Sequence, residues 1–321
     1  MTRFGFHASH EQIAPGPLLR HVQEAERAGF ASAMCSDHFA PWTSAQGESG
    51  FAWSWLGAAL ATTDLTFGVV TAPGQRYHPA VHAQGIATLA AMFPGRFWAA
   101  LGSGQALNEH ITGDRWPAKA EREERLLECV QVLRALLAGE EVSVDGRVRV
   151  DRARLWSLPE VLPLLFGAAV TPATAAWVAD WADGLITVNQ PVEVLREVLD
   201  AFHGAGGSDR PARLQVHVCW AEDDDTAQRI AHEQWRAVAL GSPVAWDVQL
   251  PSDFEVFGSY VRREDMHPSV LASSDPGQHV AWLSELAELG FEEINVHHVG
   301  QDQQGFLDVY RETVLPALGA A

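Results

Sequence analysis

The chain has 321 residues, of which 47% are apolar and 20% are charged, the composition of a folded protein with a sizeable core. Its 22 lysines and arginines are outnumbered by 41 aspartates and glutamates, so the net charge is −19 at pH 7. This charge argues against nucleic acid and an anionic membrane surface as partners, because both would be repelled.

Short apolar runs alternate with longer helical stretches along the whole chain. In chain order, the predicted strands are residues 3–8, 31–35, 66–71, 96–101, 164–168, 184–188, 214–221 and 292–297. The predicted helices are residues 17–28, 79–92, 121–137, 172–181, 192–202, 226–238, 278–289 and 305–318. About eight strand–helix units in this order predict an α/β fold with a parallel sheet, closed into a (β/α)8 TIM barrel.

Two segments interrupt this alternation. Residues 141–150 alternate around Asp145-Gly146, a strong hairpin signal, and predict an excursion from the barrel. Residues 240–274 are rich in Pro, Asp and aromatic residues without a periodic pattern, which is typical of a lid or a substrate-side insertion. We interpret residues 1–321 as a single barrel domain that carries these two additions.

The cysteines and the apolar runs indicate where the protein works. Cys35, Cys129 and Cys219 are scattered and form no CxxC pair, so a reducing cytoplasm is the expected location. No run approaches the roughly 18 apolar residues that a membrane-spanning helix needs. The sequence therefore predicts a cytoplasmic protein without a membrane partner.

In a barrel of this kind the active site lies at the carboxyl ends of the strands. Strand one ends in His7-Ala8-Ser9-His10, strand two in Ser36-Asp37-His38-Phe39, and strand four in Gly102-Ser103-Gly104-Gln105. Small residues and imidazoles suit a flat ring that lies against backbone with a titratable histidine beside it. The spacing of His7 and His10 does not suit a metal-dependent hydrolase, and Asp37 and Glu109 make no convincing glycosidase acid pair. We therefore expect no metal.

Three runs carry a resemblance to a known family: Ser36-Asp37-His38-Phe39-Ala40-Pro41-Trp42, Arg76-Tyr77-His78-Pro79-Ala80 and Gly102-Ser103-Gly104-Gln105-Ala106-Leu107-Asn108-Glu109. They resemble the luciferase-like class of flavin oxidoreductases over nearly the whole chain, and within it the F420-dependent glucose-6-phosphate dehydrogenase branch. Runs such as Trp181-Ala182-Asp183-Gly184-Leu185-Ile186 are similar to a sister group thought to use FMN. The resemblance implies a luciferase-like TIM barrel and a homodimer.

The resemblance also implies roles for single residues. His38 would lie near the reacting position as proton donor or acceptor, and Trp42 would cover the substrate side. The Val69–Val70 bond falls where the family often has a non-proline cis peptide behind the ring. Further contacts with the cofactor are implied for Asp37, for Ser103 and Asn108, and, at its phosphate, for Ala169, Val170 and Thr171.

Two departures from the family pattern bear on the chemistry. The catalytic acid of the strand-four loop is a glutamate in the family and Gln105 here, and an amide cannot exchange a proton at neutral pH. The cations that would hold a sugar phosphate are replaced by Gln190 and Ser269, so a phosphorylated sugar would meet no countercharge. The sequence therefore predicts a small, non-phosphorylated organic substrate.

Three functions remain as hypotheses. The first is an FMN-dependent oxidoreductase or monooxygenase, for which a flavin reductase is a candidate partner as the source of reduced flavin. The acidic chain favours FMN over F420, because F420 carries a longer acidic tail that would need a basic groove. The second is an F420-dependent dehydrogenase acting on an alcohol or hemiacetal. The third is a flavin-binding protein with little turnover, which Gln105 keeps open.

Several polar residues also have structural explanations. Ser103 has the character of a helix N-cap. His297 and His298 alternate in direction along a strand, so only one can face the barrel, and both are interpreted as structural histidines.

Overall fold

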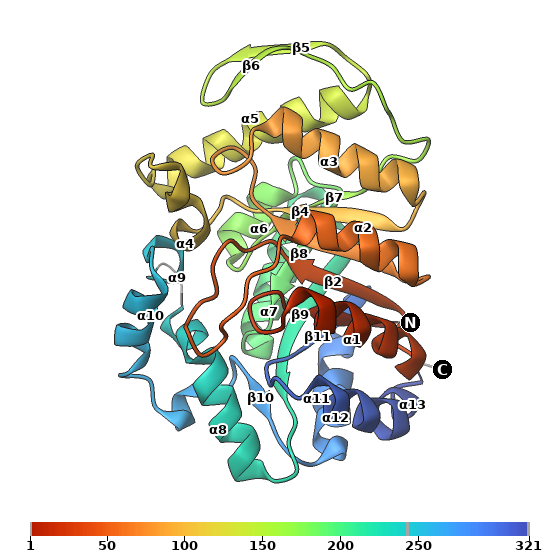
Figure 1. Cartoon of the computed structure of the whole chain (residues 1–321), viewed down its shortest axis with the longest axis vertical. Helices are drawn as coiled ribbons and strands as arrows, with labels where there is room; N and C mark the ends of the chain where they lie inside the picture. Colours follow the sequence, from red (N-terminus) through yellow and green to blue (C-terminus); the bar gives the residue numbers. More distant parts are fainter. Residues whose placement is uncertain (1, 242–243, 320–321) are drawn as a thin grey trace.

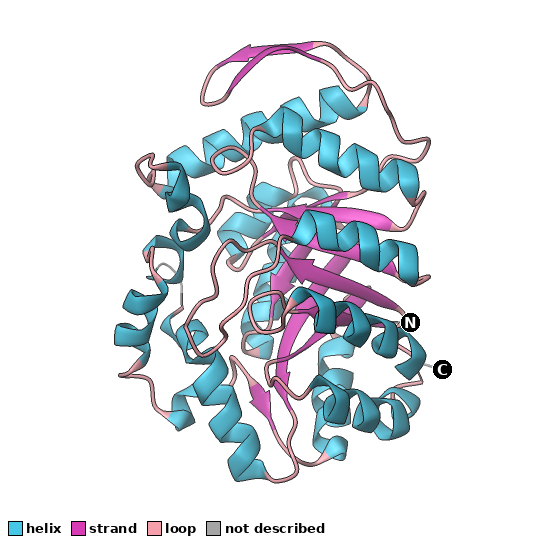
Figure 2. Cartoon of the chain, viewed as in Figure 1, coloured by secondary structure: helices cyan, strands magenta, loops and turns pink. Residues whose placement is uncertain are grey.

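The computed structural model describes residues 2–241 and 244–319, which form a closed barrel of parallel strands surrounded by helices (Figures 1 and 2). The strands hydrogen-bond around the barrel in the order β1 (Arg3–Ala8), β2 (Ser32–Ser36), β3 (Thr66–Thr71), β4 (Phe97–Leu101), β7 (Leu165–Ala168), β8 (Gly184–Val188), β9 (Ala212–Cys219) and β11 (Glu293–His298). The sheet closes because β11 pairs with β1 and β8 pairs with β9. The predicted (β/α)8 TIM barrel is confirmed.

The strands are buried on both faces, which explains why they appear in the sequence as apolar runs rather than as alternating patterns. Helices lie outside the strands and cover them. They are α1 (Pro15–Ala28), α2 (Ala52–Thr62), α3 (Pro79–Met92), α5 (Lys119–Leu137), α6 (Pro172–Val178), α7 (Val192–Phe202), α8 (Asp224–Trp235), α11 (Pro276–Glu288), α12 (Gln303–Val309) and α13 (Leu315–Ala317). Gly29 and Gly139 both adopt positive φ, as the glycine after a helix often does.

Helix α2 was not predicted. Its sequence is apolar nearly all round, so the apolar and polar faces that identify an amphipathic helix are missing. Trp55, Leu56, Ala59 and Leu60 are buried, and the helix packs between α1 and α3. Because the helix is buried on several sides, its sequence has no polar face, and the helix could not be recognised from the periodicity of its apolar residues.

Residues 240–274 contain more regular structure than the sequence indicated. The segment includes α9 (Val244–Asp247), α10 (Pro251–Gly258), the 3-10 turn Arg263–Met266 and β10 (Leu271–Ala272), and the 3-10 turn Arg236–Leu240 leads into it. Residues 242–243 lie outside the described residues. Helices of one or two turns are too short to show a hydrophobic period. Phe254 of α10 is fully buried against Leu107 and Ala237, so the segment packs onto the loops at the carboxyl ends of the strands.

Residues 142–153 form a two-stranded antiparallel ribbon, β5 (Val142–Asp145) and β6 (Arg149–Ala153), outside the barrel. Figure 1 shows this ribbon extending beyond α5, away from the barrel strands.

No helix among the described residues is long and apolar enough to cross a membrane.

Candidate active site at the carboxyl ends of the strands

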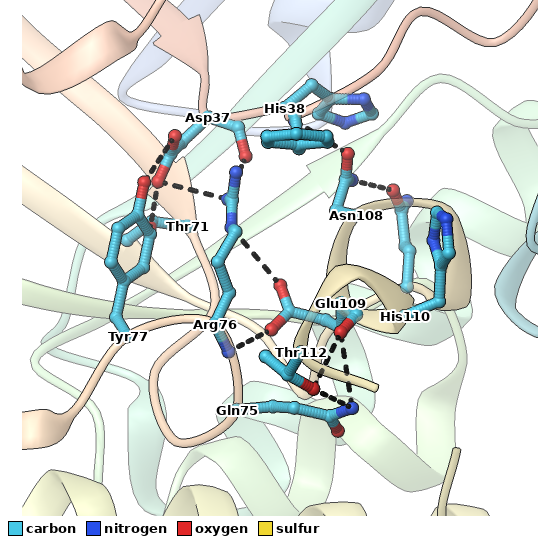
Figure 3. Close-up of polar contacts among 12 residues, drawn as sticks. Asp37, His38, Thr71, Gln75, Arg76, Tyr77, Asn108, Glu109, His110 and Thr112 are labelled. Atoms are coloured by element: carbon cyan, nitrogen blue, oxygen red, sulfur yellow. Dashed lines mark hydrogen bonds and ion pairs between the residues drawn. The ribbon is translucent and has the colours of Figure 1, made fainter. Parts of the chain in front are cut away.

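The loops after β2, β3 and β4 meet at one end of the barrel and form a polar network (Figure 3). Asp37 follows β2, and the Asp37 carboxylate is fully buried. One of its oxygens accepts a hydrogen bond from the Tyr77 hydroxyl at 3.0 Å, and the other accepts from Trp53 Nε1 at 3.1 Å and Thr71 Oγ1 at 2.9 Å. The carboxylate therefore joins the strand-two and strand-three loops, and a contact between it and a cofactor stays a prediction.

His38 lies next to a carboxylate that the sequence analysis did not assign. The His38 side chain is 10% exposed, and its Nδ1 atom lies 3.4 Å from Oε1 of the buried Glu11. The other Glu11 oxygen accepts from Ser9 Oγ at 3.1 Å. Among the described residues Nδ1 has no hydrogen-bond partner, so the two side chains lie side by side without a hydrogen bond. A carboxylate in this place can orient an imidazole that takes up a proton. In the sequence, the one indication that Glu11 lies near the site is its position shortly after strand one.

Trp42 connects His38 to the insertion. The Trp42 ring centroid lies 5.4 Å from that of His38 and 5.2 Å from that of Phe254, which it meets edge to face. Trp42 also packs against the cluster of Leu107 and Ala237. The side of His38 on which a substrate is expected is therefore bordered by aromatic and aliphatic side chains, partly from α10.

Gln105 and Asn108 lie at the start of α4 (Ala106–Glu109). Gln105 is the N-cap residue, and its Oε1 accepts from Asn108 Nδ2 at 3.1 Å. Asn108 Oδ1 accepts from the Phe39 backbone N–H at 2.8 Å. The N-cap interpretation of Ser103 is wrong, because Gly104, with φ of 90°, turns the chain before the helix begins two residues later.

Val69 and Val70 lie in a regular part of β3. Each pairs with β2 on one side and with β4 on the other, so an unbroken parallel ladder runs through this bond, and the implied cis peptide is wrong. Within residues 2–241 and 244–319, the one cis peptide bond is His267–Pro268.

The loop expected at the cofactor phosphate follows β7. Ala169 is buried, Val170 and Thr171 are half-buried, and the Thr171 hydroxyl caps α6 by accepting from the Thr174 N–H. The Gln190 side-chain amide donates to the Val170 carbonyl oxygen at 3.1 Å. This amide is therefore engaged with the loop, and Gln190 brings no positive charge to it.

Histidines fill the barrel below the strand ends. His7 and His297 stack with ring centroids 4.3 Å apart, and His217 lies 5.2 Å from His297. Burial holds the pKa of each below its usual value, so all three rings are neutral at pH 7. His298 points outward instead and stacks on Phe306, which confirms the predicted alternation. In the described part of the chain, no cluster of three His, Cys, Asp or Glu side chains is arranged to hold a metal.

Comparisons with known proteins cover the whole chain. The family model described as luciferase-like monooxygenase matches residues 1–293. An F420-dependent glucose-6-phosphate dehydrogenase of Beutenbergia cavernae is 36% identical over 330 residues, covering 100% of this chain and 98% of that protein. An F420-dependent hydroxymycolic acid dehydrogenase of Mycobacterium tuberculosis is 32% identical over 318 residues, covering 97% and 86% respectively.

A solved structure is similar over the same length. An F420-dependent secondary alcohol dehydrogenase, in complex with an F420-acetone adduct, superposes with a TM-score of 0.90 at 27% identity, over 99% of each chain. An F420-dependent tetrahydromethanopterin reductase of Methanopyrus kandleri, with a TM-score of 0.76 at 18% identity, supports the fold alone.

These relatives correct the predicted function. The FMN-dependent monooxygenase hypothesis is wrong, because the relatives that match the full chain at 31% to 36% identity are named F420-dependent dehydrogenases. The preference for FMN used the net charge, which describes the whole surface and not the surroundings of one site. The family match and the full-length relatives agree, and the chain is an oxidoreductase that belongs to the luciferase-like monooxygenase family.

Proposed function

We propose that this protein is an F420-dependent dehydrogenase that oxidises a small, non-phosphorylated alcohol or hemiacetal, or reduces the corresponding carbonyl compound. The observation that carries the proposal is the His38 imidazole, which lies 3.4 Å from the buried Glu11 carboxylate and packs beside Trp42 at the carboxyl ends of the strands. The names of the full-length relatives support F420 as the cofactor.

The strand ends fit a flat cofactor. A Cβ atom added to Gly102 would lie 3.8 Å from Ala168 Cβ and 3.9 Å from the Thr71 carbonyl oxygen, with nothing nearer. Packing within the chain therefore does not require glycine at this position, and its lack of a side chain leaves room for a ring. We assign F420 binding to this edge, with Ser103 and the loop of Ala169, Val170 and Thr171 as its polar contacts. Bound F420 would exchange a hydride with the substrate carbon.

The chain's own side chains would handle the proton. As a hydride leaves the alcohol carbon, the hydroxyl proton passes to His38, and in the reverse direction His38 returns it. Glu11, 3.4 Å away, would orient and stabilise the ring once it carries this proton. Trp42 and Phe254 exclude water from the same side, which protects a reduced cofactor from side reactions.

The substrate side favours an uncharged molecule. Gln190 donates to a backbone carbonyl, and Asn189 donates to the carbonyl oxygens of Pro268 and Ser269, so these side chains tie loops together and provide no countercharge for a phosphate. The relative solved with an F420-acetone adduct makes a secondary alcohol the best first substrate.

The proposal is tested by titration and by turnover. The protein should bind F420 with a Kd below about 100 μM, or about 5.5 kcal/mol. It should then reduce F420 with propan-2-ol and not with glucose 6-phosphate. Binding of FMN without binding of F420, or rapid oxidation of glucose 6-phosphate, would contradict the proposal.

Gln105→Glu is expected to raise turnover with little change in F420 affinity. A carboxylate at this position still accepts from Asn108 Nδ2, and it adds the group that can exchange a proton. We expect kcat to rise about tenfold or more. Steady-state kinetics and F420 titration measure the two effects, with Gln304→Glu on the exposed face of α12 as the control. An unchanged or lower kcat would show that the amide is no handicap.

A further inference from the structure

Arg76 lies between two buried carboxylates at the carboxyl ends of the strands, and Figure 3 shows it placed between Asp37 and Glu109. We propose that Arg76, itself held by Glu109, is a positioning residue that fixes the backbone next to His38. This inference rests on the proton-transfer role proposed for His38. It concerns the peptide units on either side of that residue. Arg76, in the loop between β3 and α3, contacts one of them, and Asn108 of α4 contacts the other.

The contact before His38 comes from Arg76. Its guanidinium donates to the Asp37 backbone carbonyl oxygen at 2.7 Å and lies 3.3 Å from the Asp37 carboxylate. The side chain is only 8% exposed and lies over the Tyr77 ring, with 4.6 Å between the guanidinium carbon and the ring centroid. The Asp37 carbonyl belongs to the peptide bond that leads into His38. This contact therefore restricts the position of the His38 main chain, from which the imidazole extends.

Glu109 fixes Arg76 in turn. One Glu109 oxygen accepts from the Arg76 backbone N–H at 2.7 Å, and the other lies 3.6 Å from Arg76 Nε. Burial raises the pKa of Glu109, while the hydrogen bond and the charge of Arg76 act in the opposite direction. The arginine is thereby held by its main chain and its side chain at once, which a mobile surface arginine is not.

The contact after His38 comes from the same helix. Asn108, which precedes Glu109 on α4, accepts from the Phe39 N–H at 2.8 Å. The His38 carbonyl oxygen itself accepts from Ser49 Oγ at 2.9 Å. The main chain of residues 37–39 is therefore held on both sides, and α4 provides or anchors both outer contacts.

Arg76 acts through these neighbours and not on a substrate. Its contacts in the described chain are with Asp37, Glu109 and the Tyr77 ring, and its guanidinium is almost wholly enclosed. A displacement of about 1 Å in a catalytic group costs turnover about 100-fold. Loss of Arg76 should therefore lower kcat and leave substrate binding largely intact.

The kinetic test compares two replacements. Arg76→Met is expected to lower kcat about 30- to 100-fold with propan-2-ol and F420, and to change KM less than about threefold. Arg76→Lys keeps the charge but cannot contact both Asp37 and Glu109 with one ammonium group, so we expect a loss of only about tenfold. The matched control is Arg229→Met, which removes an exposed ion pair with Glu233 on α8. Equal losses in the two Arg76 variants, or a loss confined to KM, would overturn the proposal.

A second measurement does not depend on turnover. In the cofactor-free protein, hydrogen–deuterium exchange at the Phe39 amide should speed up about tenfold in Glu109→Gln and in Asn108→Ala, but not in Arg229→Met. Glu109→Gln keeps the side-chain shape and serves where Arg76→Met fails to fold. Unchanged exchange in both variants would overturn the positioning role. If the wild-type protein oxidises no alcohol with F420, the proposed function fails, whereas the exchange result still decides the role of α4.

Discussion

His38→Ala is expected to lower turnover of an alcohol with F420 by about 100- to 10,000-fold, the usual contribution of a general acid or base. The reason is that the imidazole is the group that can take the hydroxyl proton, and Oε1 of Glu11 lies 3.4 Å from its Nδ1 atom, where the carboxylate would stabilise the protonated ring. F420 affinity should change less than about threefold, because the loss concerns the proton and not the ring. Rapid-mixing kinetics and F420 titration measure the two quantities.

The control for this variant is His203→Ala, at the end of α7 on the outside of the barrel. It should leave both turnover and binding unchanged. Full turnover in His38→Ala would remove His38 from the mechanism. A large loss of F420 binding would show instead that the ring mainly supports the cofactor.

Acidification is expected to unfold the protein well before its carboxylates are all protonated. Burial lowers the pKa of several histidines: to about 4 for His10, His82 and His217, to about 3 for His298, and well below the usual value for His7 and His297. The unfolded chain binds protons at these positions below about pH 6.5, whereas the folded chain does not. The free energy of unfolding therefore falls as the pH falls from about 6.5 toward these lower pKa values.

The size of this effect follows from the same values. At pH 5.5, each histidine with a folded pKa of about 4 lowers the free energy of unfolding by about 1 kcal/mol relative to pH 7. The contributions of several such histidines add. Since a typical domain is stable by about 5–15 kcal/mol, we expect unfolding near pH 5. Urea unfolding followed by tryptophan fluorescence at pH 7.5, 6.5 and 5.5 measures the slope. His217→Gln should reduce the number of protons taken up on unfolding, given by the slope of the unfolding free energy against pH, by about one. A free energy of unfolding that is independent of pH over this range would contradict the prediction.

Much of the barrel could be predicted because its elements are simple in sequence. The strand Thr66–Thr71 and the helices Pro79–Met92 and Val192–Phe202 were predicted with their observed ends, since buried parallel strands are continuous apolar runs and prolines or glycines mark helix ends. Helix α2 and the short helices of the insertion carry no such pattern, so they could not be found in this way.

The positions of the candidate site residues in the fold could be predicted, but their contacts only in part. His38 and Gln105 do lie just after β2 and β4, as the sequence indicated, and their place in the active site stays a prediction from the rule that such sites lie at strand carboxyl ends. The contacts of Glu11 and Arg76 beside His38 were missed, because each depends on which loop lies beside which, and sequence order alone does not contain that information. The substitution at Gln105 was visible in sequence, but its bond to Asn108 was not.

The pairing of β1 with β11 has a consequence for how the chain is made. Phe4 pairs with Ile294, so β1 finds one of its two neighbours only after all the other strands of the barrel have been synthesised. Until then β1 presents an unpaired, apolar edge of the kind that joins to other chains. Contacts this distant in sequence also form slowly. We expect the nascent protein to need protection of this edge, and overproduction to yield aggregates in which β1 has paired outside its own barrel.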